Sequence, residues 1–524
     1  MGFRRNACSL SGFSIQRREF LGISAGACWA FLNAPTGVAA DRQFKFSEYP
    51  FSLGVASGDP RADSVVLWTR LAPEPLEGGG MPPEDVKVDW ELAEDEGFKT
   101  VVQSGSATAS PQWAHSVHVE VEGLRPDRVY WYRFRCGGEV SPVGRTRTAP
   151  AAGVMLDKFR FAFASCQNYE YGYLTAYDHM VQDDLNLVVH LGDYIYESAT
   201  KDRTRRHPGG VAKTLAQYRN RYALYKLEAP LQKAHAAFPW IVTWDDHEVV
   251  NNWSGDNLRD PDGDLGAFLK RRAAAFQAYY EHMPLRKPQV PTGHSLQLYR
   301  NVNFGQLIQF AVLDTRQYRT LQPCGDGTKA PCDEMLDPNA TMLGAKQEMW
   351  LMNTLLNSTA RWNVLAQQVM MGRIDRAAGE EVKYSMDQWS GYDAARRRLL
   401  GFVSERQISN PVVITGDIHS NWVNDLKVDF DQPEQPTVAT EFVGTSITSG
   451  GDGSDGEKYR ATAMAENPFL KFYNSQRGYV RCEITQDRWQ SDYRVLDYVS
   501  KPGSPCRTRA KFVVENGQRG VQEG

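Results

Sequence analysis

The sequence lacks a basic excess and lacks an internal repeat or a long low-complexity segment. Its 59 lysine and arginine residues face 63 aspartate and glutamate residues, for a formal net charge of −4. Proteins that bind nucleic acid usually carry a clear basic surplus, so we expect no stable nucleic-acid binding. With 42% hydrophobic and 23% charged residues, the composition is that of an ordinary globular protein. At 524 residues, two or more domains are expected.

A long apolar segment is also missing at the N-terminus, where a short one occurs. Arg17 and Arg18 precede Phe20 and Leu21, and the apolar stretch ends near residue 32. About 20 apolar residues are needed to span a bilayer, so this stretch is too short. Small residues at 38–40 suit a signal peptidase. Residues 1–40 therefore predict a twin-arginine export signal, with the export machinery as a partner and a periplasmic or extracellular location.

Cysteines are few: eight in the chain, two of them in the predicted signal. Export permits disulfides. Cys324 and Cys332 flank a Gly-Asp-Gly sequence and can close a short loop, whereas Cys482 and Cys506 are a weaker pair. Spacing alone leaves the pairing open. The twin-arginine route carries folded proteins, so a metal loaded in the cytoplasm is compatible with it.

Residues 44–150 are predicted to form a small β domain. Short alternating segments at 65–69, 86–92 and 118–121 are separated by turn residues. Residues 123–134 resemble the turn and tyrosine corner of fibronectin type III-like domains. Because residues 148–153 are typical of a linker, we predict a separate N-terminal β-sandwich. The alternative is that these strands form the edge of one larger fold.

Residues 155–500 predict an α/β layered domain, followed by a C-terminal tail at 501–524. Apolar strand segments alternate with helical ones, which is typical of layered α/β folds. The strands are expected at 159–164, 187–191, 240–243, 307–313, 362–366 and 412–415. The helices are expected at 171–184, 264–283 and 345–357. In such domains chemistry gathers at the carboxyl ends of the strands.

Four predicted strands end in potential metal ligands. The clusters are Ser165-Cys166-Gln167-Asn168, Gly192-Asp193-Tyr194-Ile195-Tyr196, Asp245-Asp246-His247-Glu248 with Asn251 and Asn252, and Gly416-Asp417-Ile418-His419. Buried charge is costly unless it is paired or bound to metal. The clusters therefore predict a metal site, with Asp193, Asp246 and His419 as ligands even without any family comparison.

The spacing within these clusters favours two metals. Gly192 permits a tight turn, after which Asp193 can share its two oxygens between two ions. A phenolate from Tyr196 or a thiolate from Cys166 favours a ferric ion over calcium or magnesium. Asp417 and His419 would point the same way if the extended strand continued through them. A two-metal centre suits in-line attack of water on phosphorus.

The order of these motifs resembles that of calcineurin-like metallophosphatases. Gly-Asp-x-x-Tyr, Asp-His-Glu and Gly-Asp-x-His occur in the order of that superfamily. Three departures matter: Asp246 replaces an asparagine, Asp417 replaces a histidine, and Cys166 stands where an aspartate is common. These departures, the export signal and the leading β domain resemble the alkaline phosphatase D (PhoD-like) family.

The resemblance implies a fold and a ligand set. The fold would be α/β, with a fibronectin III-like sandwich ahead of a metallophosphatase β-sandwich core flanked by helices. Fe³⁺ would be held by four residues: Cys166, Asp193, Tyr196 and His419. Calcium, expected as two ions, would be held by Asp193, Asp417 and residues of the 246–252 segment, with Asp246 and Asn252 as candidates.

The resemblance also implies catalytic roles. His247 would contact the phosphate or protonate the leaving group, and Asp193 would be essential to catalysis. Which of Asp245, Asp246, Asn251 and Asn252 bind metal stays open.

Plainer interpretations compete for single residues. Taken alone, Cys166 is more often a small buried hydrophobe and Tyr196 a core aromatic residue. Asp245 is expected to be structural, and His190 to be a core histidine with satisfied hydrogen bonds. The basic segment 201–233 is interpreted as a solvated helix face. The glycine-rich segment 445–451 lacks a P-loop lysine motif and is expected to be a loop near the site.

The function predicted is that of a secreted, metal-dependent phosphoesterase acting on phosphomonoesters or phosphodiesters. Its substrate would be a phosphate ester of a small molecule, a nucleotide, a teichoic acid-like polymer or a lipid, and a monomer is expected. The alternative is phospholipase D-like cleavage on the same scaffold. A non-catalytic surface-binding protein ranks lower, because Asp193, His247 and His419 are all present.

Overall fold

The structure, a computed structural model, describes residues 45–258 and 262–524. Residues 46–524 form one compact unit. The predicted export signal, residues 1–40, lies outside the described residues. No helix within the described ranges combines the length and the apolar character that crossing a membrane requires.

A ten-stranded sheet has three parallel strands at its centre, β9 (Phe159–Ala164), β10 (Leu187–His190) and β11 (Pro239–Val242). Its strand order is β24-β23-β22-β21-β9-β10-β11-β1-β2-β5. The outer strands are β1 (Val55–Gly58), β2 (Val65–Arg70), β5 (Ser116–Val121), β21 (Gly478–Ile484), β22 (Arg488–Leu496), β23 (Cys506–Glu515) and β24 (Gln522–Glu523). The predicted strands at 159–164, 187–191 and 240–243 are thereby confirmed to within one residue.

A second sheet has seven strands in the order β12-β13-β15-β17-β19-β18-β20. Four neighbours run parallel: β13 (Ile308–Val312), β15 (Trp362–Ala366), β17 (Pro411–Thr415) and β19 (Ala439–Val443). The others are β12 (Arg300–Phe304), β18 (Asn421–Leu426) and β20 (Leu470–Asn474). A two-stranded ribbon pairs β14 (Thr328–Lys329) with β16 (Tyr384–Ser385).

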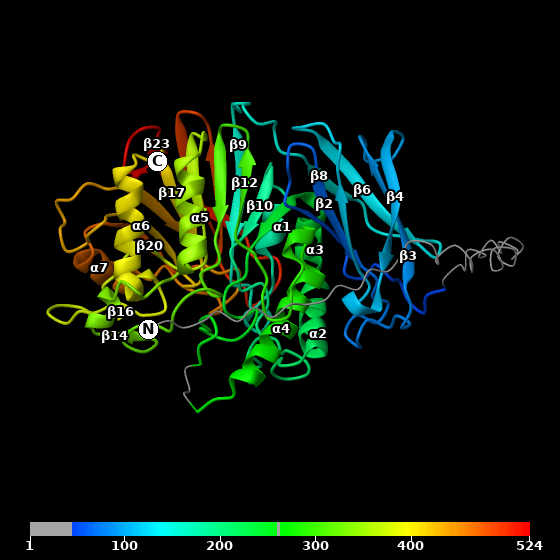
Figure 1. Ribbon diagram of the computed structural model, residues 1–524, viewed down its shortest axis with the longest axis horizontal. Helices are drawn as coiled ribbons and strands as arrows, with labels where there is room; N and C mark the ends of the chain where they lie inside the picture. Colours follow the sequence, from blue (N-terminus) through cyan, green and yellow to red (C-terminus); the bar gives the residue numbers. More distant parts are fainter. Residues whose placement is uncertain (1–44, 259–261) are drawn as a thin grey trace, which may run out of the picture. The chain divides into compact units, whose positions relative to one another are not determined.

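The two large sheets pack face to face and are covered by helices on their outer sides (Figure 1). Phe161 and Phe163 of one sheet share a buried cluster with Phe310 and Trp362 of the other. Helices α1 (Ala176–Met180), α2 (Leu215–Lys226), α3 (Ala229–Ala237) and α4 (Leu265–His282) cover the ten-stranded sheet. Helices α5 (Gly344–Leu356) and α6 (Asp393–Glu405) cover the seven-stranded sheet, and α7 (Glu457–Glu466) contacts β20. The result is a mixed α/β fold with a β-sandwich core flanked by helices.

The central strands of both sheets are apolar along their whole length because both faces of each sheet are covered. Each sheet packs against the other sheet on one face and against helices on the other, so both sets of side chains are buried. Every residue of β10, β13 and β17 is accordingly buried.

Strands of the region predicted as an N-terminal module, 44–150, fall in two different sheets. Strands β1, β2 and β5 extend the ten-stranded sheet, because β1 pairs in parallel with β11. Only β3 (Val86–Ala93), β4 (Val101–Ala109), β6 (Val129–Cys136), β7 (Glu139–Val140) and β8 (Gly144–Arg147) form a sheet of their own. For β1, β2 and β5, the structure agrees with the alternative that these strands form the edge of one larger fold.

One contact agrees with the predicted tyrosine corner. The hydroxyl of Tyr130 accepts a hydrogen bond from the backbone N–H of Arg125 at 3.1 Å, as such a corner requires. The wider likeness of this region to fibronectin type III domains stays a prediction.

Two further boundaries need correction. The predicted tail at 501–524 contains β23 and β24, whose pairing with β22 makes it part of the ten-stranded sheet. The predicted helix at 171–184 is instead a 3₁₀ turn at Tyr169–Tyr171 followed by the short α1. The helices predicted at 264–283 and 345–357 are confirmed as α4 and α5 to within one residue at each end. Other 3₁₀ turns cover Pro111–Trp113, Lys287–Gln289, Asp333–Leu336 and Trp389–Tyr392.

The structure shows which of the two candidate cysteine pairs forms a disulfide. Cys324 and Cys332 are joined. Cys482 on β21 and Cys506 on β23 are free thiols separated by β22. Strands lie about 4.8 Å apart, so two strand spacings exceed the distance of about 7 Å that a disulfide can bridge.

Candidate metal centre

The carboxyl ends of the parallel strands bring four predicted clusters to one edge of the fold. Cys166 follows β9, Asp193 follows β10, Asp246 follows β11, and Asp417 follows β17. A bridge between Ser165 and the segment after β19 links the two sheets at this edge. Residues distant in sequence therefore meet where the strand-end rule places them.

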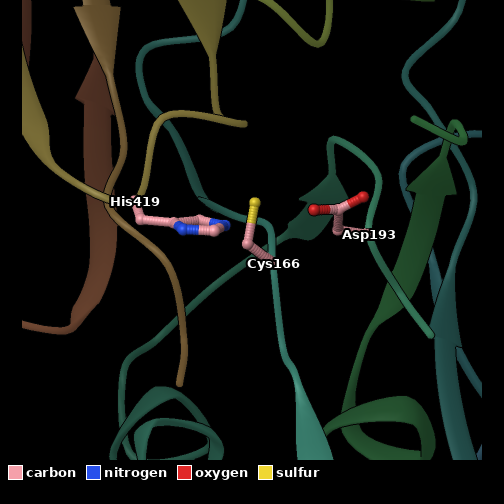
Figure 2. Close-up of side chains that lie close together, drawn as sticks. All are labelled: Cys166, Asp193 and His419. Carbon is pink, nitrogen blue, oxygen red and sulfur yellow. The ribbon is translucent and has the colours of Figure 1, made fainter. Parts of the chain in front are cut away.

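One group of ligand atoms comes from Cys166, Asp193 and His419, whose donor atoms all lie within 4.8 Å of one another. Figure 2 shows the thiol between the imidazole and the carboxylate. Tyr196 belongs to the same group, since its hydroxyl donates to Asp193 Oδ2 at 2.6 Å and lies 3.2 Å from His419 Nε2. We call Cys166, Tyr196 and His419 the thiol cluster. All four residues predicted to hold Fe³⁺ are thus neighbours.

A second group contains only carboxylates. Asp245, Asp246 and Asp417 have oxygens within 4.8 Å of one another, and we call them the carboxylate cluster. Asp193 also groups with Asp246 and His247. Asp193 therefore lies beside both clusters, as expected of a carboxylate shared between two ions.

The 246–252 segment folds back on itself. This fold bears on which of its residues can bind metal. The backbone N–H of Asn252 donates to Asp246 Oδ2 at 2.6 Å, so these two residues lie together. Asn251 is exposed, and its backbone N–H donates instead to Glu197 Oε1 at 3.1 Å. Asn252 thus lies beside Asp246, whereas the backbone of Asn251 contacts Glu197.

Five of the predicted site residues share an uncommon backbone conformation. They have positive φ angles between 51° and 63°: Cys166, Asp193, Asn252, Asp417 and His419. This left-handed region is sparsely used by residues other than glycine, and such strain concentrates at functional sites. It also explains one wrong expectation. The extended run does not continue past Thr415, so Asp417 joins the carboxylate cluster while His419 joins the thiol cluster.

The turn that presents Asp193 is held by one buried glutamate. Glu248 accepts hydrogen bonds from the backbone N–H groups of Asp193 (3.2 Å), Tyr194 (2.6 Å) and Asp245 (2.8 Å). Gly192 has φ 106°, and a Cβ there would lie 2.4 Å from Asp245 Cβ. Glycine is therefore required at this position, as the sequence predicts.

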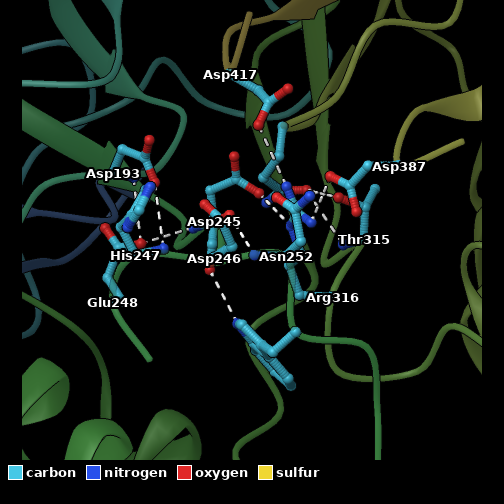
Figure 3. Close-up of polar contacts among 12 residues, drawn as sticks. Asp193, Asp245, Asp246, His247, Glu248, Asn252, Thr315, Arg316, Asp387 and Asp417 are labelled. Atoms are coloured by element: carbon cyan, nitrogen blue, oxygen red, sulfur yellow. Dashed lines mark hydrogen bonds and ion pairs between the residues drawn. The ribbon is translucent and has the colours of Figure 1, made fainter. Parts of the chain in front are cut away.

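Arg316 is a buried site residue that the sequence reasoning missed. Its guanidinium donates to Asp245 Oδ1 (2.5 Å), Asp387 Oδ2 (2.8 Å) and Asp417 Oδ1 (3.3 Å), and it is 0% exposed (Figure 3). Asp245 is therefore one arm of an ion-pair network, in keeping with its expected structural role. A signal did exist, because Arg316 follows β13, another parallel strand of the same edge.

Other missed residues support the thiol cluster. Ser449 Oγ donates to the Tyr196 hydroxyl at 2.7 Å, and it comes from the 445–451 loop, which is confirmed to lie near the site. Arg477 donates to the backbone oxygen of His419 and to Ser446 Oγ. Ser449 stands in the glycine-rich segment that the sequence singled out, whereas Arg477 stands in no recognisable local motif.

His247 lies beside the thiol cluster and pairs with a carboxylate. Its Nδ1 lies 2.7 Å from Glu197 Oε2, and its ring stacks on Tyr196 with 4.1 Å between centroids. Its side chain keeps 16% of its surface exposed. Burial lowers the pKa of His247, but Asp246, Asp193 and Glu197 outweigh burial and raise the pKa above its ordinary value.

The thiol cluster is neutral before metal binds. Burial, reinforced by Asp193, raises the pKa of both Cys166 and Tyr196 well above their ordinary values. Burial, reinforced by Arg477 and His247, lowers the pKa of His419 to about 3. The protein alone therefore keeps a thiol, a phenol and an uncharged imidazole side by side.

The carboxylates behave differently from one another. Burial raises the pKa of Asp193 and of Asp417, although His247 and Arg316 respectively oppose this. Burial would also raise the pKa of Asp246, but His247 and Arg316 hold it below its ordinary value. Asp245 Oδ2 and Asp246 Oδ1 are buried and accept no hydrogen bond from any described residue. Unsatisfied buried carboxylate oxygens fit a cation, so the donor set suits metal binding.

Two expectations outside the site are wrong. His190 is buried as expected, but neither ring nitrogen has a hydrogen-bond partner among the described residues. The basic segment 201–233 is not simply a solvated face. Arg221 is buried and donates to backbone oxygens of Tyr196 and Ser198, while Arg205 pairs with Glu228.

Comparison with protein families decides the assignment. The family model described as PhoD-like phosphatase matches residues 161–493, and the one described as PhoD-like phosphatase, N-terminal domain, matches residues 37–150. The chain belongs to the PhoD-like phosphatase family. This phosphatase is 52% identical over 484 residues to alkaline phosphatase D of Bacillus subtilis (strain 168), covering 91% of this chain and 83% of the relative.

Solved structures agree with the family. A structure titled "Structure of PhoD" matches with a TM-score of 0.89 and 51% identity, over 92% of this chain and 93% of the other. A purple acid phosphatase, PPD1 from yellow lupin (Lupinus luteus) seeds, matches with a TM-score of 0.53 and 11% identity, over 88% and 74% of the two chains. The latter likeness concerns the fold alone. The chain is a phosphoesterase, and the non-catalytic alternative is set aside.

Proposed function

We propose that this phosphoesterase is an exported alkaline phosphatase of the D type with an iron–calcium centre. The observation that carries the proposal is the meeting of Cys166, Tyr196 and His419 with the carboxylate cluster on either side of Asp193. The name of the Bacillus relative supports the alkaline phosphatase activity.

The donor chemistry supports two kinds of cation. Cys166, Tyr196, His419 and Asp193 would hold Fe³⁺, because thiolate and phenolate donors suit a ferric ion. Asp193, Asp246, Asp417 and Asn252 would hold one or two calcium ions through oxygen atoms alone. When bound, the cations supply Lewis-acid stabilisation of the phosphoryl charge and activation of the attacking water.

His247 supplies the proton in this proposal. Its raised pKa keeps it charged near neutral pH, and Glu197 holds Nδ1 so that Nε2 remains for the leaving-group oxygen. A positioned acid of this kind contributes about 10²–10⁴-fold to a rate.

Export is supported by residues 14–40 and by the Cys324–Cys332 disulfide, since disulfides persist in oxidising compartments. The twin-arginine pathway would deliver the folded protein to the periplasm or the cell exterior. Phospholipase D-like cleavage remains the second candidate, because it would use the same ligands.

One set of assays tests the proposal. Metal analysis of protein exported through its own signal should find iron and calcium; zinc alone, with no iron, would contradict the assignment. p-Nitrophenyl phosphate, its bis-ester and phosphatidylcholine separate monoesterase, diesterase and phospholipase activities. Turnover of phosphatidylcholine with neither nitrophenyl ester hydrolysed would favour the phospholipase candidate.

The role of His247 is tested with two leaving groups. His247→Asn should slow an alkyl phosphate, whose leaving group needs a proton, by about 10²-fold or more. It should slow p-nitrophenyl phosphate much less. Equal losses on both substrates would exclude proton donation by His247.

A further inference from the structure

Two adjoining cavities border β12, the edge strand of the seven-stranded sheet. One has a volume of about 730 Å³ and is closed by helix α5 (Figure 1), and the other has a volume of about 500 Å³. Asn303, Gly305 and Thr359 line both cavities. Gly305 and Thr359 stand shortly before β13 and β15, at the amino ends of these parallel strands, whereas the metal ligands follow carboxyl ends. The cavities are therefore separate from the metal centre.

The larger cavity is lined by side-chain amides. Among the described residues, Lys346 is the one charged residue that lines it, and no carboxylate does. A metal cation would find no anionic ligand there, and a multiply charged anion would find a single exposed lysine. Each amide offers two donors and an acceptor, so together they suit a neutral ligand that both donates and accepts hydrogen bonds. The amides belong to Asn301, Asn303, Gln309, Asn353 and Asn357.

Two buried glutamines, one in each cavity, have an acceptor oxygen without a partner. Gln309 is 6% exposed; its Nε2 donates to the Thr354 backbone oxygen at 3.4 Å, and its Oε1 accepts from no described residue. Gln289 lines the smaller cavity, is 7% exposed, and has a buried Oε1 without a hydrogen-bond partner among the described residues. Buried polar atoms are normally satisfied, so each cavity calls for a ligand that donates, such as a hydroxyl.

An apolar surface lies beside the amides. Trp350 and Met349 line the larger cavity, and Met349 is 65% exposed. The Trp350 ring is partly buried and lies 5.0 Å from the Tyr299 ring. Because residues three or four apart share a helix face, Lys346, Trp350 and Asn353 project from the same side of α5. A flat apolar ring next to amides matches a sugar, whose ring faces carry C–H groups and whose edges carry hydroxyls.

We propose that the two cavities form a binding site for a neutral oligosaccharide. Gln309 and Gln289 accept hydrogen bonds from its hydroxyls, the exposed asparagines bind further hydroxyls, and Trp350 packs against a sugar ring. The combined space is ample for a ligand, since binding cavities usually measure about 300–1,000 Å³. The inference does not depend on the iron–calcium centre, whose proposed ligands line neither cavity. Its consequence is that the phosphoesterase can attach to a polysaccharide while the metal centre stays free for its substrate.

The first test is titration calorimetry of the whole protein with three neutral oligosaccharides: cellohexaose, maltohexaose and chitohexaose. At least one should bind with a Kd of about 1 mM or tighter. Trp350→Ala should weaken that binding by about tenfold or more, because it removes an aromatic anchor. Trp113→Ala is the matched control, since Trp113 is also partly buried beside a tyrosine ring, at 5.6 Å from Tyr280, and lines neither cavity. The control should change the affinity by less than about twofold.

A second variant avoids disturbing the packing of an aromatic ring. Asn303 is exposed and lines both cavities, so Asn303→Ala should fold normally and weaken binding by about 2–10-fold, the effect of one lost hydrogen bond. Asn339→Ala, at an exposed asparagine that lines neither cavity, should leave the affinity unchanged. Hydrolysis of p-nitrophenyl phosphate should stay within about twofold of the wild type in all of these variants, because the cavities are separate from the metal centre.

Three results would overturn the inference. The first is a wild-type protein that binds none of the three oligosaccharides. The second is binding that Trp350→Ala and Asn303→Ala both leave unchanged, because the sugar would then lie elsewhere. The third is a wild-type dimer in sedimentation analysis that Asn303→Ala dissociates, since the edge strand would then be an interface between copies of the chain. Weaker binding in both variants with unchanged hydrolysis would support the inference, whether or not the proposed metal assignment holds.

Discussion

The two clusters on either side of Asp193 differ in how their charge is balanced. The carboxylate cluster is neutralised in part by Arg316, a cation built into the chain. Among the described residues, no cation donates a hydrogen bond to a side chain of the thiol cluster; Arg477 contacts this cluster through the backbone oxygen of His419. Before metal binds, the carboxylate cluster contains one carboxyl group with a lowered pKa, Asp246, whereas the pKa of Cys166 and of Tyr196 in the thiol cluster is raised.

This difference separates two ways of building a metal site. Metal binding to the thiol cluster must displace protons from Cys166 and Tyr196, so only a strongly acidic cation competes there. The carboxylate cluster needs no such displacement at Asp246, whose pKa is already low. The two clusters can therefore bind two different cations, each cation in its own cluster.

The largest effect is expected from replacing Asp193, the residue that lies beside both clusters. Asp193→Ala should lower kcat/KM for p-nitrophenyl phosphate by about 10³-fold or more, because it removes a donor from each ion. The exposed Asp184→Ala serves as a control and should stay within about twofold. Circular dichroism would confirm that both variants fold. Substantial activity in Asp193→Ala would place the reaction elsewhere.

A pair of single substitutions sharpens the comparison by separating the ions. Cys166→Ser should deplete iron while calcium remains, and Asp417→Asn should deplete calcium while iron remains. Loss of an outer-shell partner costs about 10–100-fold in affinity or activity, so each ligand change should cost at least that. Elemental analysis of the purified variants provides the measurement. If each variant lost both ions equally, the two clusters would be one cooperative site.

The smallest effect is expected at a buried carboxylate outside both clusters, which serves as a reference. Glu441 on β19 is 0% exposed and accepts hydrogen bonds from Met371 N–H, Gly372 N–H and Asn424 Nδ2. Burial raises the pKa of Glu441 to about 7, with these hydrogen bonds opposing it. The raised pKa means that its stabilising contribution is present below about pH 4.5 and is lost as the pH rises through 7.

Glu441→Gln removes this titration. The free energy of unfolding of the wild type, relative to that of the variant, should fall by up to about 3 kcal/mol between pH 4.5 and pH 8. Denaturant unfolding at a series of pH values measures it. A difference between the two proteins that does not vary with pH would show that Glu441 does not titrate in this range.

The sequence predicts the centre well where chemistry follows a buried strand. Cys166, Asp193 and Asp246 each come directly after an apolar run, and the parallel arrangement of those strands carries them to one edge. Arg316 obeys the same rule and could have been found by extending it to β13. Asp387 gives no such signal, because it lies in irregular chain and only the folded structure brings it to its partners Arg316 and Arg319.

The remaining errors have physical causes. The left-handed conformation at Asp417 and His419 is a property of the backbone that residue type does not reveal. The shared ten-stranded sheet escaped prediction because pairing between β1 and β11 joins residues far apart in the chain. A strand's sequence shows its own alternation but not the identity of its neighbour.

The position of β9 in that sheet has a consequence for biosynthesis. Its two neighbours are β10, which follows it directly, and β21, which begins at Gly478. A ribosome must therefore make most of the chain before the strand that carries Cys166 is paired on both edges. β21 follows directly on Arg477, whose guanidinium donates to the backbone oxygen of His419. The strand that pairs with the second edge of β9 is therefore translated long after Cys166. A truncated message would leave Cys166 on a strand with one open edge.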